Sequence, residues 1–224
     1  KGLHPTQVVA GAFTAIILLG TFLLSLPMAT TSGKATSFLD ALFTATSATT
    51  VTGLSTLNVE THWNLFGHVV IALLIEFGGF GIVGFASLVA ILLEGKVSLK
   101  NRLLTSSEAG SNAANIRGLL FNVLKIMLFF QALLFVFLFV RFITEYGYEW
   151  NKALGHGLFH AMSAFNNAGF ALYADNMMQF ARDGWMLVPI FVTVFIASIG
   201  FPTIVEIRDR LKMKLGQAFN RKVN

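Results

Sequence analysis

The chain contains no cysteine and carries little charge. Among its 224 residues only 12% are Asp, Glu, Lys or Arg, whereas soluble domains carry about 25%. Without cysteine there is no disulfide framework, no thiolate metal site and no cysteine nucleophile. Hydrophobic residues instead make up 55% of the chain. This composition is typical of a protein that lies in lipid.

The few charges are unevenly distributed. The net charge is +5, but no basic stripe is interleaved with aromatic residues, so we expect no nucleic-acid partner. Basic loops of membrane proteins stay in the cytoplasm, and we therefore expect the middle segment and the C-terminal end there. The basic residues of these two segments are Lys96, Lys100, Arg102, Arg117, Arg208, Arg210, Lys212, Lys214, Arg221 and Lys222.

Four apolar runs are close to or above the roughly 20 residues that a membrane-spanning helix needs. They are Val8–Leu26, Trp63–Leu93, Leu119–Val140 and Trp185–Val205. Trp and Tyr rings favour the headgroup level of a bilayer. All of them lie at the expected outer ends of these runs or in outer loops: Trp63, Trp150, Trp185, Tyr146, Tyr148 and Tyr173. Together the aromatic and basic residues predict a multi-pass protein with a cytoplasmic N-terminus.

One sequence pattern occurs twice without a gap. Leu42–Gly53 aligns with Leu158–Gly169, and Leu, Phe, Ala, Ser, Ala and Gly coincide. The stretches at about 35–48 and 151–164 are too short to span at a rise of about 1.5 Å per residue. We expect two half-length helices there, with Ser37 and Asn151 as N-caps. Extended backbone at membrane depth is tolerated only when buried or lining a water-filled path, so the duplicated loop indicates a pore.

The chain therefore divides into two tandem helix–pore-loop–helix repeats. We expect the first repeat at residues 1–93, a cytoplasmic linker at 94–117, and the second repeat with its basic cytoplasmic end at 118–224. The linker mixes polar and apolar residues, and we expect it to lie along the membrane surface.

The two loops favour ion coordination. In the first, Thr and Val favour extended backbone, and Gly53 can adopt the positive φ that turns a carbonyl toward an axis. Carbonyl oxygens aimed at an axis can replace the water shell of an alkali cation. Alone, a Thr-rich outer turn is an equally good interpretation, but the second copy favours the filter. The candidate ligands are backbone carbonyls of Thr50, Val51, Thr52, Gly53, Asn167, Ala168 and Gly169.

Several segments together resemble the Trk/Ktr/HKT superfamily of potassium transporters, most closely the membrane subunit of the Ktr system. These segments are Leu3–Gln7, Gly20–Pro27, Ala41–Ala48, Thr52–Leu54, Leu74–Gly81 and Ser163–Phe170. The resemblance implies an all-α integral membrane fold with four helix–pore-loop–helix repeats around one potassium-channel-like pore. It also implies potassium uptake, because glycine in the first loop accompanies potassium in this superfamily, whereas serine accompanies sodium.

This sequence holds two repeats rather than four. Two loops do not close a four-fold ring, so we expect the remaining two repeats on the same polypeptide, with a second copy as the alternative. The resemblance further implies a homodimer, a cytoplasmic nucleotide-binding ring subunit as regulator, and location in the bacterial inner membrane. Potassium is the expected transported ion, sodium stimulation is left open, and no organic cofactor is expected in this chain.

Three further motifs have competing interpretations. Glu76 lies inside the second apolar run, where relatives more commonly carry Gln. A carboxylate at this depth is protonated, paired or facing water; a hydrogen bond to a neighbouring helix or loop is favoured over a pore contact.

His156 and His160 have the spacing of a metal pair but lack a third ligand, which favours packing. Gly79–Gly84 fits G-x-G-x-x-G without the preceding strand of a dinucleotide fold, and its small residues favour close helix contacts.

Three classes of function compete. Potassium uptake through a carbonyl filter accounts for both loops. An intramembrane enzyme would depend on His156, His160 and Glu76, which we expect at different membrane depths, so we expect no enzyme. A sodium-permeable transporter is an alternative within the first class. A non-transporting membrane scaffold explains the helices but leaves the duplicated loop without a role.

Overall fold

The computed structural model describes residues 5–97 and 111–199, so the middle of the expected linker and the basic C-terminal segment lie outside the described residues. The α-helices are α1 (Pro5–Ser25), α2 (Phe38–Thr49), α3 (Val59–His62), α4 (Leu65–Val97), α6 (Ser111–Thr144), α7 (Trp150–Phe165) and α8 (Gly184–Ile199). Short 3-10 helices lie at Pro27–Ala29 and Met178–Phe180. The described residues form no β-strand, only one isolated bridge between Thr30 and Trp63. The expected all-helical fold class is confirmed.

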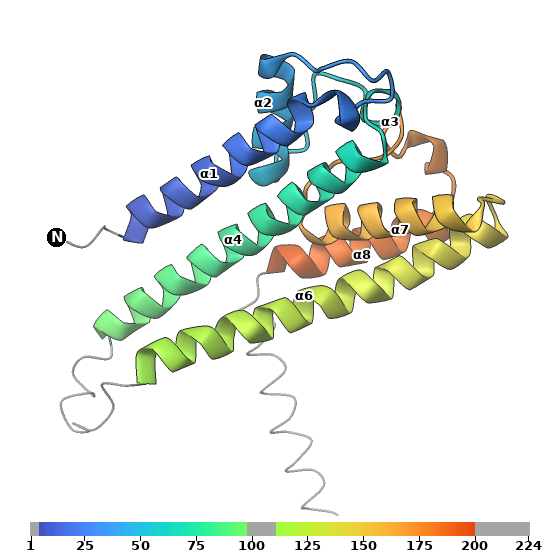
Figure 1. Cartoon of the computed structure of the whole chain (residues 1–224). Helices are drawn as coiled ribbons and strands as arrows, with labels where there is room; N and C mark the ends of the chain where they lie inside the picture. Colours follow the sequence, from blue (N-terminus) through green and yellow to red (C-terminus); the bar gives the residue numbers. More distant parts are fainter. Residues whose placement is uncertain (1–4, 98–110, 200–224) are drawn as a thin grey trace, which may run out of the picture.

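The helices fall into two groups of the same order. In each, a helix is followed by a second helix, an irregular connection and a third helix: α1, α2 and α4, then α6, α7 and α8. Figure 1 shows α4 between α1 and α6, with α2 beside the C-terminal end of α1 and α7 along α6. By length and composition alone, α4 and α6 can cross a membrane, whereas the described parts of α1 and α8 are shorter apolar helices.

The starts of the two shorter helices differ from one another. The expected cap at Ser37 is confirmed, because its hydroxyl accepts a hydrogen bond from the Asp40 N–H at 3.2 Å. The expected cap at Asn151 is wrong. Helix α7 begins at Trp150 after Glu149, and the Glu149 carbonyl already accepts the first helical bond from the Ala153 N–H. The chain therefore enters the helix two residues earlier than expected.

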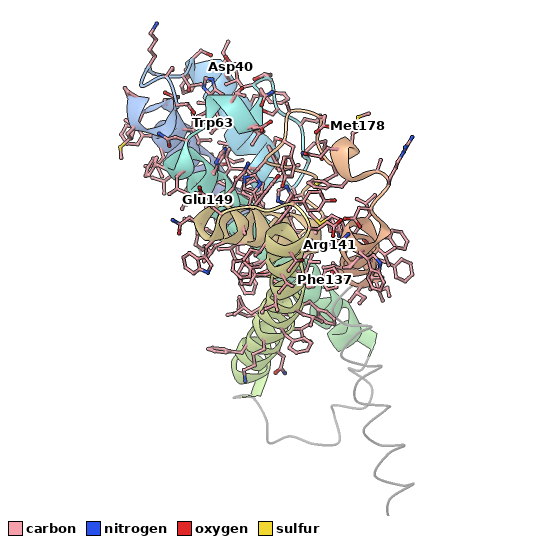
Figure 2. All side chains as sticks on the ribbon, turned by 90° about the vertical axis from the view of Figure 1, so that its right-hand side faces the viewer. Asp40, Trp63, Phe137, Arg141, Glu149 and Met178 are labelled. Carbon is pink, nitrogen blue, oxygen red and sulfur yellow. The ribbon has the colours of Figure 1, made fainter. Side chains whose placement is uncertain are left out.

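The first of two main cores draws on both helix groups, since it also contains Phe159 and Phe170, whereas the second core lies within the later group. The outer faces of the helices are apolar. The first core includes Leu24, Trp63 and Ile71, and the second includes Leu138 and Phe142. Many large apolar side chains nevertheless lie exposed on the helices, and Figure 2 shows them along the outside of the molecule. They include Phe77, Phe129, Leu133, Val136, Trp185, Phe191 and Phe195. So much exposed apolar surface is unusual for a soluble protein and suits contact with lipid or further protein.

Polar and aromatic residues gather at one end of the helix array. Figure 2 shows Asp40, Trp63 and Glu149 at this end, away from the C-terminal end of α4 and the N-terminal end of α6. Arg141 lies near the same end of α6, where its guanidinium contacts Asp183 at 3.0 Å and Glu145 at 3.2 Å. We call this the polar end; its position outside the cell stays a prediction.

Candidate functional site

The first loop begins as a Schellman cap on the C-terminus of α2. The Val51 N–H donates to the Ala48 carbonyl at 3.2 Å, and the Thr52 N–H donates to the Ser47 carbonyl at 2.8 Å. This pair of reversed bonds satisfies carbonyls that the helix end leaves unpaired. Thr50 caps the helix, and Val51 takes the left-handed conformation with φ +48°. A β-branched residue in this conformation is a genuine outlier, which marks the loop as held in place by its surroundings.

The second loop repeats this geometry at the C-terminus of α7. The Asn167 N–H donates to the Ala164 carbonyl at 3.1 Å, and the Ala168 N–H donates to the Ser163 carbonyl at 2.8 Å. Asn166 is the capping residue, and Asn167 is left-handed with φ +57°. Asparagine tolerates this conformation far better than valine. The two copies of the sequence pattern therefore fold into the same backbone shape even where their side chains differ.

The two loops meet at the glycines that end the pattern. Gly53 and Gly169 both have positive φ, +80° and +72°, as the sequence predicts for these positions. Their backbones touch: a Cβ atom added to Gly53 would collide with the Ala168 carbonyl oxygen and lie 3.1 Å from the Gly169 Cα. A Cβ atom on Gly169 would lie 3.5 Å from the Gly53 Cα. Segments far apart in the chain are thus placed at a single point.

Side chains hold each loop against its own helix. The Thr50 hydroxyl donates to the Thr46 carbonyl at 2.8 Å and contacts the Thr52 hydroxyl at 2.7 Å. At the position equivalent to Thr50, the Asn166 side-chain amide donates to the Met162 carbonyl at 3.0 Å. Both contacts reach back four residues, so threonine and asparagine perform the same task with different chemistry.

Two serines to which the sequence alone assigns no role hold the residues after the glycines. The Ser47 hydroxyl accepts from the Leu54 N–H at 2.8 Å, and the Ser163 hydroxyl donates to the Phe170 carbonyl at 2.6 Å. Ser47 and Ser163 coincide in the duplicated pattern. That coincidence was the available signal, but only the folded loop reveals that each serine reaches seven residues forward.

The loops suit a cation because their carbonyls are free and two helices end there. Within the described chain, no hydrogen bond ends on the carbonyl oxygens of residues 50–53 or 166–169. The C-termini of α2 and α7 both run into the loops, and a helix C-terminus carries about half a negative elementary charge. Dipoles and unpaired carbonyls therefore both favour positive charge at this point.

A cavity of about 210 Å³ lies beside the two glycines. Its lining comes from both repeats and includes Gly53, Ser55, Asn58, Gly169 and Asn176. The segments that form it are tied together, because the Ala174 N–H of the second repeat donates to the Glu60 carboxylate of the first at 2.8 Å. The structure thus places a polar chamber directly beside the meeting point of the loops.

Glu76 lies on α4 behind the second loop. Its Oε2 atom accepts hydrogen bonds from the Gln131 side-chain amide and from the Asn166 side-chain amide, both at 2.9 Å. The neighbouring Gly78 and Gly79 explain how α4 approaches so closely. A Cβ atom on Gly78 would collide with the Thr49 carbonyl, and one on Gly79 would collide with the Asn166 side chain. The small residues of this helix therefore allow close contact with the end of α2 and with the second loop.

The two histidines of α7 hydrogen-bond to the protein itself. His160 is buried; its Nδ1 atom donates to the His156 carbonyl at 2.7 Å and its Nε2 atom accepts from the Leu172 N–H at 3.2 Å. His156 contacts the Tyr173 hydroxyl at 3.0 Å. Both imidazoles thus fasten the segment after the second loop to α7, and the described residues contain no cluster of three metal-ligating side chains.

Residues 3–223 match the family TrkH, cation transport protein. The chain belongs to this family. The match runs through both helix groups and both loops, so the expected membership of the Trk/Ktr superfamily is confirmed. The description of the family as cation transport proteins agrees with the exposed apolar faces of the helices.

Curated relatives of this TrkH chain carry potassium-uptake names. It is 38% identical to the Ktr system potassium uptake protein B of Bacillus subtilis (strain 168), an alignment that covers 94% of this chain and 46% of the relative. It is 37% identical to the potassium/sodium uptake protein NtpJ of Enterococcus hirae, over 90% of this chain and 44% of the relative. The Ktr system potassium uptake protein B of Vibrio alginolyticus is 34% identical, over 92% of this chain and 45% of the relative. The chain spans about half the length of the curated relatives it matches.

Proposed function

We propose that this TrkH chain forms half of a potassium-selective pore that carries potassium into the cell. The filter is built from backbone carbonyls of residues 50–53 in the first loop and 167–169 in the second. Each carbonyl replaces part of the water shell of the ion. The observation that carries the proposal is the contact between the two glycine-ended loops, because it brings unpaired carbonyls of both repeats to one point.

The pore is completed by partners outside this sequence. Two repeats supply two loops, and a ring of four needs two more, which we assign to the rest of the polypeptide. The share of the relatives that this chain covers supports that assignment. We further propose a homodimer of the complete protein in the bacterial inner membrane, with the N-terminus in the cytoplasm. A cytoplasmic nucleotide-binding ring would regulate it, as suggested by relatives that are named parts of a Ktr system.

A sodium-permeable transporter is the second candidate function. One specific observation favours it: the relative from Enterococcus hirae is named a potassium/sodium uptake protein and is 37% identical. Against it stands Gly53, which leaves the first loop without a side chain where the two loops touch. Stimulation of potassium uptake by sodium is compatible with either function.

The test is uptake of potassium and sodium by cells that lack their own potassium-uptake systems. The complete reading frame is expressed as wild type, as Gly53→Ser and as Gly33→Ser, with the regulatory subunit supplied. Gly33 is the matched control, because it also has a positive φ, +67°, but a Cβ atom added there would have no neighbouring atom within 4 Å. Both variants therefore strain the backbone, whereas only Gly53→Ser pushes a side chain into the neighbouring loop.

We expect wild type and Gly33→Ser to take up potassium in preference to sodium, and Gly53→Ser to lose most of that preference. A Gly53→Ser protein with unchanged preference would contradict the filter assignment. A protein that reaches the membrane and moves neither cation would instead support a scaffold role. Equal uptake of both cations by the wild type would favour the sodium-permeable alternative.

A further inference from the structure

A single carboxylate oxygen joins the two repeats behind the second loop. Glu76 belongs to α4 of the first repeat, whereas Gln131 belongs to α6 and Asn166 to the second loop. The Glu76 Oε2 atom accepts from both side-chain amides at 2.9 Å. Gln131 is buried and Glu76 is half-buried. A buried polar group must find hydrogen-bond partners within the protein, so these three residues depend on one another for their placement.

Asn166 is fixed from several sides. Its Nδ2 atom donates to the Glu76 carboxylate and also to the Met162 carbonyl, at 2.9 and 3.0 Å. Its Oδ1 atom lies where a Cβ atom on Gly79 would be. Asn166 immediately precedes the left-handed Asn167. A rotation of Asn166 would therefore displace the carbonyls that follow it.

The first loop is held in a different way. Its equivalent residue, Thr50, bonds to Thr46 and Thr52, which belong to its own repeat. The second loop instead takes part of its support from a helix of the other repeat through Glu76. A change at Glu76 therefore acts on one loop and leaves the support of the other in place.

We propose that Glu76 and Gln131 are positioning residues that set the place of the second loop and thereby the ion selectivity of the pore. This inference rests on the proposed function. Glu76 acts through the Asn166 amide and does not itself contact the ion. Removal of the carboxylate should therefore increase, by about tenfold or more, the fraction of molecules in which the second loop is displaced.

The experiment compares Glu76→Leu, Glu76→Gln and Thr193→Val in the complete protein. Glu76→Leu removes both hydrogen bonds, whereas the carbonyl oxygen of Glu76→Gln can still accept both amides. Thr193→Val is the matched control, since Thr193 is a buried polar residue on α8 whose hydroxyl bonds to the Pro189 carbonyl within its own helix. Potassium and sodium uptake are measured at equal amounts of protein in the membrane.

We expect Glu76→Leu to lower the preference for potassium over sodium by about tenfold. We expect Glu76→Gln to restore most of it and Thr193→Val to match the wild type. Unchanged preference in Glu76→Leu would overturn the inference. If Glu76→Leu fails to reach the membrane, Gln131→Leu decides the question, because it removes one partner of Glu76 and leaves both hydrogen bonds of Asn166 in place. A loss in the same direction is expected, and an unchanged preference would overturn the inference.

A second readout does not depend on transport. Amide hydrogen exchange is measured on the purified protein for peptides that cover residues 47–54 and 163–170. In Glu76→Leu we expect at least roughly tenfold faster exchange in the second peptide and unchanged exchange in the first. Equal exchange in wild type and variant would refute the positioning role. A wild type that moves no cation would refute the proposed function, while the exchange result would still decide the role of Glu76.

Discussion

Gly53 and Ala168 lie so close together that a Cβ atom added to Gly53 would overlap the Ala168 carbonyl oxygen. This contact joins the two loops at the position where the duplicated pattern ends. It also explains why the position has no side chain: the neighbouring loop occupies the space that a Cβ atom would need. The contact is asymmetric, because a Cβ atom on Gly169 would meet the Gly53 Cα only at 3.5 Å.

This asymmetry predicts unequal effects of serine at the two glycines. Both substitutions place a side chain at positive φ, at a cost of roughly 1–2 kcal/mol. Gly53→Ser additionally forces the two loops apart, and overpacking costs about 1–3 kcal/mol more. We expect Gly53→Ser to lower potassium preference by about tenfold more than Gly169→Ser, measured as the ratio of potassium to sodium uptake. Equal losses would contradict the asymmetric contact.

Loss of the hydroxyl of Ser47, which holds the first loop, should lower stability and selectivity more than loss of the hydroxyl of Thr44. Ser47→Ala leaves the part-buried Leu54 N–H without its acceptor, and a donor left unsatisfied away from water costs about 1–3 kcal/mol. Thr44 lies on the same helix, fully buried, and its hydroxyl has no hydrogen-bond partner in the described structure. We therefore expect Thr44→Val to be neutral or stabilising. Thermal unfolding in detergent and the selectivity of uptake would check both variants, and a larger effect of Thr44→Val would count against this account.

Close contact predicts opposite effects of alanine at two helical glycines. A Cβ atom on Gly78 would collide with the Thr49 carbonyl, whereas one on Gly155 would have no atom within 4 Å. Glycine inside a helix is less favourable than alanine by about 0.5–1 kcal/mol. We expect Gly155→Ala to raise the apparent melting temperature slightly and Gly78→Ala to lower it and reduce the amount of protein in the membrane. Similar melting temperatures for the two variants would disprove the tight contact of α4 with the end of α2.

Tyr146 predicts a loss of stability at alkaline pH. Burial, together with its hydrogen bond to the Asp183 carboxylate at 2.7 Å, raises the pKa of Tyr146 from 10.0 to about 12. Because the pKa is higher in the folded state, the neutral phenol stabilises the fold fully below pH 10. That contribution falls as the pH rises from about 10 to about 12. The apparent melting temperature of the wild type should fall across this range.

The control for this pH dependence is Tyr146→Phe. It removes the titrating hydroxyl but leaves the pair between Arg141 and Asp183. We expect a smaller decrease of the melting temperature between about pH 10 and 12 in this variant. Parallel curves for the two proteins would assign the alkaline loss to other groups.

Much of the fold was predictable because its signals are local in the sequence. Apolar runs indicated the long helices, and Ser37 indicated the start of α2, since a capping hydroxyl acts within three residues. The prediction failed at Asn151 because the turn before α7 leads the chain into the helix at Trp150 without a side-chain cap. The positive φ of Gly53 and Gly169 was also predictable, since glycine ends both copies of the pattern.

The expectation of extended backbone in the first loop is wrong at Val51, which takes a left-handed conformation that nothing in the chemistry of valine favours. The reversed hydrogen bonds at the end of α2 enforce it. The role of Ser163 was equally hidden, because its partner Phe170 is placed by the fold of the loop rather than by helical spacing.

The sequence by itself determined the membrane character of the chain, the order of its helices and the position of the two loops. Composition, the length of the apolar runs and the repeated pattern are properties of residues close together in the sequence, so they can be recognised without the fold. Only the tertiary structure decided that Gly53 meets Ala168 and that Glu76 reaches Gln131 and Asn166. These contacts join residues far apart in the chain, and they depend on how closely the glycines of α4 let the two repeats approach.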